Sequence, residues 1–278
     1  MRSKRAAMLI AVIATFANAA SAETPYERGR YLVGSILNCG NCHTPKGPNA
    51  DKLMSGGMRF DTPGFNVVAA NITPDRETGI GRWSDADIRK ALIEGVRPNG
   101  VRLAGVMPSS FYKILSNDDL NAVVAFLKAA PPVSNKVDAP VYKTEQKHEP
   151  FPGAEKPYAR KDMRTRVQRG FYLATIGHCM ECHTPAEKGA GFFATQLGKG
   201  GREFKGPWGV STSANVTSSK SAGIGGWTDA EIRRAITQGV SRDGHALKGP
   251  MGFASYAKMT RPDVDAIVAW LRTLPAKE

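Results

Sequence analysis

The sequence contains one long internal repeat, and this repeat constrains the fold more than any other feature. When the chain is shifted by 144 residues, residues 71–131 align with residues 215–275 without a gap, and 24 of the 61 aligned positions are identical. The period far exceeds the roughly 20–50 residues of a solenoid repeat. The sequence therefore predicts two copies of one domain, arranged in tandem.

A cysteine–histidine motif stands near the start of each copy. Cys-x-x-Cys-His occurs twice and uses all four cysteines of the chain: Cys39, Cys42 and His43 in the first copy, and Cys179, Cys182 and His183 in the second. Two thiols one helical turn apart can form thioether bonds to the two vinyl groups of a haem, and the histidine that follows can reach the iron. We therefore expect two covalently bound haem c groups, one in each copy.

Three other uses of the paired cysteines explain less. A zinc ribbon places its CxxC pairs about 15–20 residues apart, whereas 136 residues separate the two pairs here. A thioredoxin-type redox pair needs a βαβ context, which the sequence lacks. Two local disulfides suit an oxidising compartment, but they give no role to the histidine that follows each pair.

The N-terminus has the pattern of a secretory signal peptide. Arg2, Lys4 and Arg5 precede an apolar stretch over residues 6–17, and the small residues 20–22 follow it. The apolar stretch is too short to span a bilayer comfortably, which makes an uncleaved anchor the weaker alternative. We expect cleavage after residue 22 and a periplasmic mature protein without an integral membrane segment.

A proline-rich segment separates the two copies. Residues 131–161 contain six prolines among charged residues, a composition that predicts an extended, semi-stiff linker on the surface. The expected organisation is a signal peptide (1–22), a first domain (23–134), a linker (135–161) and a second domain (162–278).

Each copy carries three helix signals. Thr24 and Glu27 form a capping box with Pro25 at the first helical position, and similar signals recur later in both copies. The helices are expected over residues 24–37, 84–96 and from 116 onward, and over about 162–176, 228–240 and from 260 onward. Long loops rich in Gly, Pro and Asn lie between them, and a haem would fill the core that such loops leave. The predicted fold class is all-α.

The second axial ligand of each iron should occupy the same position in both copies. Met107 and Met251 do so, 68 and 72 residues after the first cysteine of their motifs. The methionines without an equivalent are Met54, Met58, Met163, Met180 and Met259. His178 and His245 are rival ligands in the second copy, but neither is duplicated, and His178 adjoins the motif too closely to reach the far face of its haem. Both are expected at the surface or beside a propionate.

Further motifs carry a family resemblance. Residues 71–75 (Asn-Ile-Thr-Pro-Asp), residues 78–83 (Thr-Gly-Ile-Gly-x-Trp) and Met107-Pro108 with Tyr112 follow a Cys-x-x-Cys-His-Thr-Pro sequence. This set resembles bacterial class I cytochrome c domains. The chain is particularly similar to the cytochrome c subunits of periplasmic alcohol, gluconate and fructose dehydrogenases. The resemblance implies His43 and His183 as proximal ligands of the iron, and Met107 and Met251 as distal ligands.

The resemblance also implies details of packing. Each proximal imidazole would donate a hydrogen bond to the carbonyl of Pro45 or Pro185. Gly29 and Gly170 would mark the crossing of the first helix with the last, against Phe126 and Trp270. The indoles of Trp83 and Trp227 either donate to a haem propionate or pack against the haem or the core, and the same alternatives apply to Tyr112 and Tyr256. The second copy has Gly252 where the first has Pro108.

Two functions compete. The first is an electron carrier or dehydrogenase subunit, which moves single electrons from a donor dehydrogenase toward an oxidase or another cytochrome. Without the signal peptide, 35 Lys and Arg face 25 Asp and Glu, a net charge of +10. That charge would steer partners with acidic patches and leaves peripheral membrane association open, whereas export argues against nucleic acid. The alternative is a di-haem enzyme, such as a peroxidase or an oxidase of sulfur compounds, with one open haem.

Overall fold

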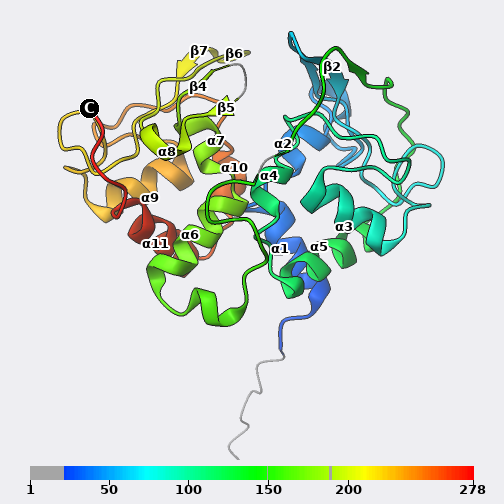
Figure 1. The fold of residues 1–278 in the computed structure, drawn as a ribbon, viewed down its shortest axis with the longest axis horizontal. Coiled ribbons are helices and arrows are strands. Elements are labelled where there is room, and N and C mark those ends of the chain that lie inside the picture. Colours follow the sequence, from blue (N-terminus) through cyan, green and yellow to red (C-terminus); the bar gives the residue numbers. More distant parts are fainter. Residues whose placement is uncertain (1–21, 149, 188–189) are drawn as a thin grey trace, which may run out of the picture.

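The structure is a computed structural model that describes residues 22–148, 150–187 and 190–278. The predicted signal peptide, apart from residue 22, lies outside the described residues. In Figure 1 the first half of the chain lies on the right and the second half on the left, with helices below and strands above. None of the helices in these ranges is both long enough and apolar enough to cross a membrane.

The two halves share a hairpin and five helices in the same order, and the second half adds β4, β5 and α8 before its hairpin. The first half and the linker contain α1 (Pro25–Gly34), α2 (Gly40–His43), η1 (Gly47–Asn49), β1 (Arg59–Asp61), β2 (Phe65–Val68), α3 (Asp85–Glu94), α4 (Ser109–Tyr112), α5 (Asn117–Ala129), β3 (Val141–Tyr142) and η2 (Arg160–Met163). The second half contains α6 (Arg166–Ile176), α7 (Cys179–His183), β4 (Ala186–Glu187), β5 (Ala190–Gly191), α8 (Phe193–Gln196), β6 (Glu203–Gly206), β7 (Gly209–Thr212), α9 (Asp229–Gln238), α10 (Phe253–Tyr256) and α11 (Arg261–Leu271).

The predicted helices are confirmed, with ends set by local hydrogen bonds. Thr24 and Glu27 form a capping box at the start of α1, in which each side chain bonds to the backbone amide of the other residue. Equivalent capping boxes stand at the starts of α3 and α9. Gly95 and Gly239 end α3 and α9 in the left-handed conformation, with φ of 65° and 64°. The helix expected from about residue 162 begins later, at α6, because η2 occupies the preceding residues.

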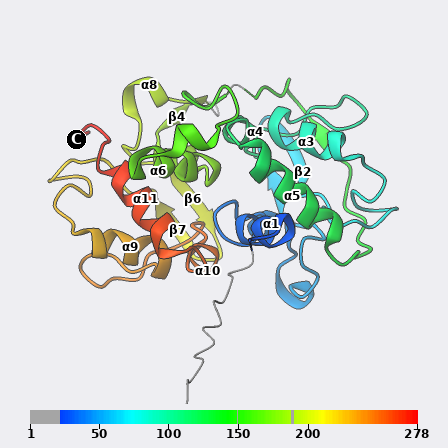
Figure 2. The same ribbon diagram turned by 90° about the horizontal axis from the view of Figure 1, so that it is seen from below.

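The first and last helices of each half cross at a glycine, as the resemblance implies. Figure 2 shows α1 beside α5 in the first half and α6 beside α11 in the second. A Cβ at Gly29 would lie 1.9 Å from the carbonyl oxygen of Ala122 in α5, and one at Gly170 would lie 1.9 Å from that of Ala266 in α11. Only glycine therefore permits this approach of the two backbones.

Aromatic side chains stand at both crossings, again as the resemblance implies. A Cβ at Gly29 would lie 2.7 Å from the Cβ of Phe126, and one at Gly170 would lie 2.8 Å from the Cβ of Trp270. Each glycine is therefore enclosed by a backbone carbonyl and by the base of a large side chain.

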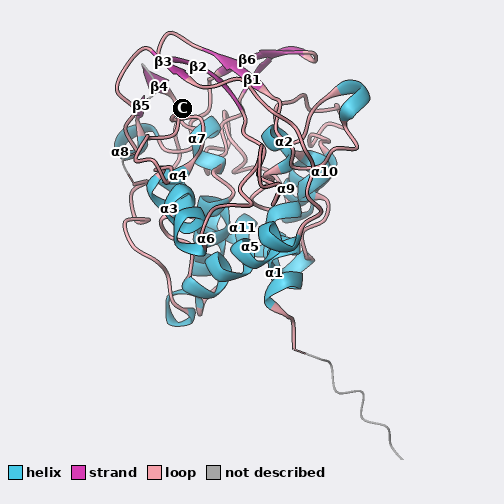
Figure 3. Ribbon diagram, turned by 90° about the vertical axis from the view of Figure 1, so that its right-hand side faces the viewer, coloured by secondary structure: helices cyan, strands magenta, loops and turns pink. Residues whose placement is uncertain are grey.

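The prediction of an all-α fold is wrong, because the described residues also form small antiparallel sheets (Figure 3). β1 pairs with β2 in the first half, and β6 pairs with β7 at the equivalent positions of the second. A short β4–β5 pair also follows α7. These strands are two to four residues long, so their alternation of side chains is too brief to distinguish them from loops in the sequence.

The linker is extended, but it is not a spacer on the surface alone. Its strand β3 adds to β2 as a third strand. Further along, Phe151 is buried and its ring stacks on Phe111 of α4, with centroids 5.1 Å apart. The ring also meets Phe193 edge-on at 5.0 Å. The linker therefore packs against both halves.

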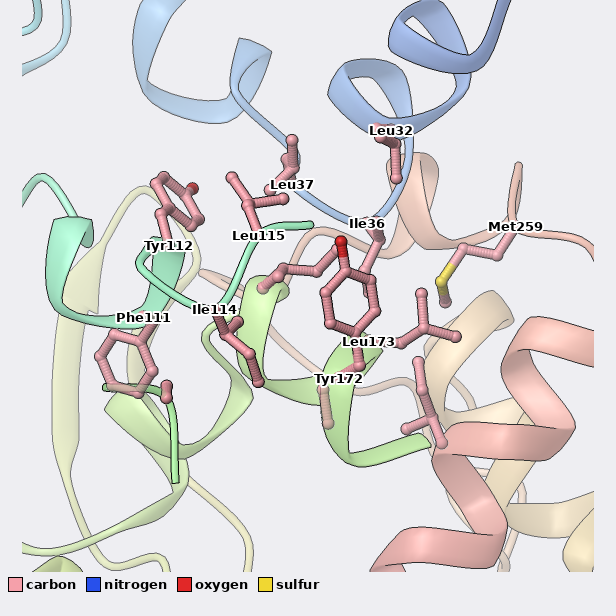
Figure 4. Packing of buried hydrophobic residues seen from close by; sticks show 14 of the residues in the cluster. Leu32, Ile36, Leu37, Phe111, Tyr112, Ile114, Leu115, Tyr172, Leu173 and Met259 are labelled. Atoms are coloured by element: carbon pink, nitrogen blue, oxygen red, sulfur yellow. The ribbon is translucent and has the colours of Figure 1, made fainter. Parts of the chain in front are cut away.

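The two halves share one hydrophobic core, and Figure 4 shows part of it where Leu32 and Ile36 of the first half meet Leu173 and Met259 of the second. Its residues come from both copies of the repeat, so the two copies pack directly against each other.

Tyrosine hydroxyls reinforce this contact reciprocally. Tyr31 of α1 donates to Asp263 of α11 (2.6 Å), and Tyr172 of α6 donates to Asp119 of α5 (2.6 Å). Arginines of α1 and α6 pair with the same two carboxylates, each from its own half: Arg28 with Asp119, and Arg169 with Asp263. The halves therefore meet through a nearly two-fold arrangement.

Candidate functional site

A large cavity opens in the first half beside the Cys-x-x-Cys-His motif. Its volume is about 460 Å³, and its walls include Cys39, Cys42, His43 and Met107. Cys39 is the N-cap residue of helix α2, which carries the rest of the motif, and the loop between α3 and α4 carries the methionine. The motif and the methionine, which are far apart in sequence, therefore line one cavity.

The second half has an equivalent cavity. Its volume is about 370 Å³, and its walls include Cys179, Cys182, His183 and Met251. Met180 and Met259, which the duplication argument sets aside, line this cavity as well. Both are buried in the core cluster. Of the three methionines that line this cavity, Met251 is the one whose equivalent, Met107, also lines the first cavity.

Each motif histidine is held by a hydrogen bond from its ring. Nδ1 of His43 lies 2.7 Å from the carbonyl oxygen of Ala70, and Nδ1 of His183 lies 2.8 Å from that of Ala214. The expected partners, Pro45 and Pro185, are therefore wrong. The observed carbonyls stand just after β2 and β7, because the hairpins bring these segments over the motif helices. With Nδ1 engaged, Nε2 is the nitrogen left for a metal.

Burial governs the protonation of the motif side chains. It lowers the pKa of both His43 and His183, which favours the neutral imidazole that ligates metals. It raises the pKa of Cys39 and Cys179 to about 12. All four cysteines are unbridged. Thiols that stay protonated at neutral pH are poor redox nucleophiles, which argues against a thioredoxin-type pair.

The cavity walls are otherwise mainly apolar and aromatic. Trp83 and Tyr112 line the first cavity, and Trp227 and Tyr256 line the second. Burial raises the pKa of both tyrosine hydroxyls, so they stay neutral at physiological pH. An apolar wall with a few polar groups suits a large planar cofactor.

Sequence reasoning missed part of each wall. Asn38 and His178 line both cavities. His178 is expected at the surface or beside a propionate, and that expectation does not include the cavity of the opposite half. Linker residues 136–140 and Tyr142 line the first cavity only. The equivalent positions of Asn38 and His178, each directly before a motif cysteine, are the one signal that could have identified this pair.

The cavities fit a haem better than a bare metal ion. Among the described residues, no group of three or more His, Cys, Asp or Glu side chains could hold an ion. Both volumes lie within the range of about 300–1,000 Å³ that is usual for cofactor sites. Each cavity also combines a cysteine pair, a neutral imidazole and a thioether. This donor set matches covalently attached haem with histidine and methionine on the iron.

The comparisons with known proteins agree with this chemistry. Residues 167–275 match the family model for cytochrome c. The chain is 31% identical to the fructose dehydrogenase cytochrome subunit of Gluconobacter japonicus over 93% of its own length and 54% of the relative's. It is 28% identical to the gluconate 2-dehydrogenase cytochrome c subunit of Pantoea cypripedii, over 91% of this chain and 60% of that one.

A shorter relative matches over more of its own length. The chain is 29% identical to a protein of Cereibacter sphaeroides named as a di-haem cytochrome of c type, over 86% of this chain and 83% of that one. By contrast, the chain spans about half the length of the fructose dehydrogenase subunit.

Proposed function

Because the chain contains a cytochrome c domain and is related to the cytochrome c subunits of bacterial dehydrogenases, we propose that it is a periplasmic di-haem cytochrome that carries single electrons. The observation that carries the proposal is the repetition of one donor set in two cavities. The proposed domain boundaries are residues 23–134 and 162–278, with residues 135–161 as the linker.

Each half would hold its haem with equivalent residues. Cys39 and Cys42, or Cys179 and Cys182, would form the thioether bonds, with His43 and Met107, or His183 and Met251, on the iron. A bound haem supplies a reversible one-electron couple, and paired histidine and methionine ligands favour a raised potential. The protein's part is to keep both axial ligands in place and to surround the group with apolar walls.

The carrier hypothesis explains the methionines better than the enzyme hypothesis does. A catalytic haem needs an open or easily lost ligand position, whereas each cavity here offers a methionine at an equivalent position. The proposed donor is a dehydrogenase, in keeping with the names of the relatives. The proposed acceptor is an oxidase or another cytochrome, and the basic surface would favour acidic patches on both partners.

Cyanide binding distinguishes the two hypotheses. In the oxidised protein, both haems should show the weak red band of methionine sulfur on ferric iron, and both should resist cyanide. Met107→Ala should open the first iron to cyanide and leave the second closed. Met54→Ala is the control, because Met54 belongs to the same half but does not line the cavity. A wild-type haem that binds cyanide at once would favour the enzyme, and an unchanged response in Met107→Ala would reject Met107 as the ligand.

A further inference from the structure

One residue of each half borders both cavities. Asn38 and His178 line both cavities, and each directly precedes the first cysteine of its motif. Both have left-handed backbones, with φ of 49° and 41°. This conformation is uncommon for residues other than glycine and is least costly for Asn, Asp and His. The repeat therefore places two equivalent residues where the halves meet.

Asn38 reaches the methionine loop of the opposite half, the segment between α9 and α10 that carries Met251. A Cβ at Gly252 would lie 2.1 Å from Nδ2 of Asn38, so the amide occupies the space that a larger residue would need. Gly252 directly follows Met251. The first half has Pro108 at the equivalent position, and the glycine of the second half is explained by the space that Asn38 takes.

His178 reaches the opposite half in the other direction. Its ring meets Tyr112 edge-on, with centroids 6.4 Å apart and planes inclined at 73°. Tyr112 is buried in the wall of the first cavity. On its other side, Nδ1 of His178 lies 2.9 Å from a carboxylate oxygen of Glu181 in α7. The ring is thus held between its own motif helix and the first cavity.

We propose that Asn38 and His178 are positioning residues that act across the halves, so that His178 completes the first haem site and Asn38 completes the second. This inference rests on the proposed function. With a haem held in each half, an electron that passed from one to the other would oxidise one iron and reduce the other, without a proton or further reactant. Asn38 and His178 border both sites, and they couple the environment of each site to the residues of the other.

The test asks whether a change in the second half alters the haem of the first. The probe is the two-haem protein with His178→Asn, since asparagine tolerates the left-handed backbone and stands at the equivalent position of the first half. Paramagnetic NMR signals are assigned to each haem with variants that lack both cysteines of one motif. The signals of the first haem should shift. Its reduction equilibrium constant should change at least twofold, equivalent to about 18 mV for one electron.

His245→Asn is the matched control, because it makes the same change in the same half at an exposed residue outside both cavities. It should leave the first haem unchanged. Asn38→Gly, which keeps the left-handed backbone accessible, should shift the signals of the second haem and its methionine. If His178→Asn does not fold, Asn38→Gly decides the test.

Each outcome separates the two proposals. If both haems are attached but each substitution affects only the haem of its own half, the inference across the halves is overturned and the proposed function stands. If the wild-type protein carries no covalent haem, the proposed function itself fails.

Discussion

The two halves hold equivalent methionine loops by different means. In the first half the linker does so: Gln146 accepts a hydrogen bond from the amide of Gly105 (3.2 Å), and His148 lies 2.9 Å from the carbonyl oxygen of Leu103. In the second half the β6–β7 hairpin does so. The indole of Trp208 packs on Gly249, and Ser211 donates to the carbonyl of the same glycine. A duplicated site can therefore keep its chemistry while its support diverges.

The hairpins differ at one position that takes part in both supports. Gly64 of the first half corresponds to Trp208 of the second in the 144-residue shift. The carbonyl of Gly64 accepts hydrogen bonds from the linker amides of Lys143 and Thr144, and β3 extends the sheet beside it. Within the described residues, β7 has no third strand, and the large side chain of Trp208 covers the methionine loop instead.

Removing the cysteines of one half should produce the largest difference between the two halves. Cys39→Ala with Cys42→Ala should abolish covalent haem in the first half alone, and Cys179→Ala with Cys182→Ala should abolish it in the second. The reason is that each motif lines its own cavity. Mass analysis of haem-bearing proteolytic peptides measures the loss. Two covalent haems in either variant would contradict the assignment.

The helix crossings of both halves should be equally sensitive to replacement of their glycines. Gly29→Ala and Gly170→Ala should each destabilise the protein by about 3 kcal/mol or more, because the new methyl group would overlap a backbone carbonyl. Gly34→Ala is the control, since a Cβ added there would have no other atom within 4 Å. Denaturant unfolding checks the result. A similar small effect for all three substitutions would show that the crossing is adaptable.

The hydroxyl groups of Tyr172 and Tyr31 should contribute unequally to the free energy of unfolding. Tyr172→Phe should cost about 1–3 kcal/mol, because Tyr172 is only 1% exposed and its hydroxyl donates to the buried Asp119. Tyr31→Phe should cost less, about 1 kcal/mol, because Tyr31 is only partly buried. Denaturant unfolding of each variant, with circular dichroism as the probe, compares the two. Equal costs would mean that the difference in burial has no energetic consequence.

The two supports of the methionine loops give the smallest expected effect. Trp208→Ala should loosen only the Met251 loop and speed cyanide binding at the second haem by about threefold, the equivalent of about 0.7 kcal/mol. Gln146→Ala should act only on the Met107 loop, and more weakly, because His148 still supports it. Stopped-flow absorbance follows cyanide binding, and variants that lack both cysteines of one motif assign each phase to its haem. An effect of Trp208→Ala on the first haem would contradict separate supports.

The sequence predicts the repeated features well. Capping residues such as Thr24 and Ser84 mark helix starts because their hydrogen bonds are local. The duplication identifies Met107 and Met251 as an equivalent pair, and the structure places both at cavity walls. Residues that repeat at matching positions are predictable because two independent copies point to the same contact.

Features that depend on contacts between distant segments were missed. The hairpin strands are too short to signal themselves, and the carbonyls of Ala70 and Ala214 reach the histidines only after the hairpins form. The role of His178 at the first cavity depends on how the halves meet. No periodicity in the chain encodes that contact, so the histidine resembles an ordinary surface residue in the sequence.

The most direct test of two covalently bound haems is the mass of the intact, denatured protein purified from the periplasm of a host that attaches haem c. Denaturation removes any haem that is merely bound, so the measurement counts thioether-linked groups. The account predicts the mass of the mature polypeptide plus two haem groups. The mass of the polypeptide alone, or with one haem, would contradict it.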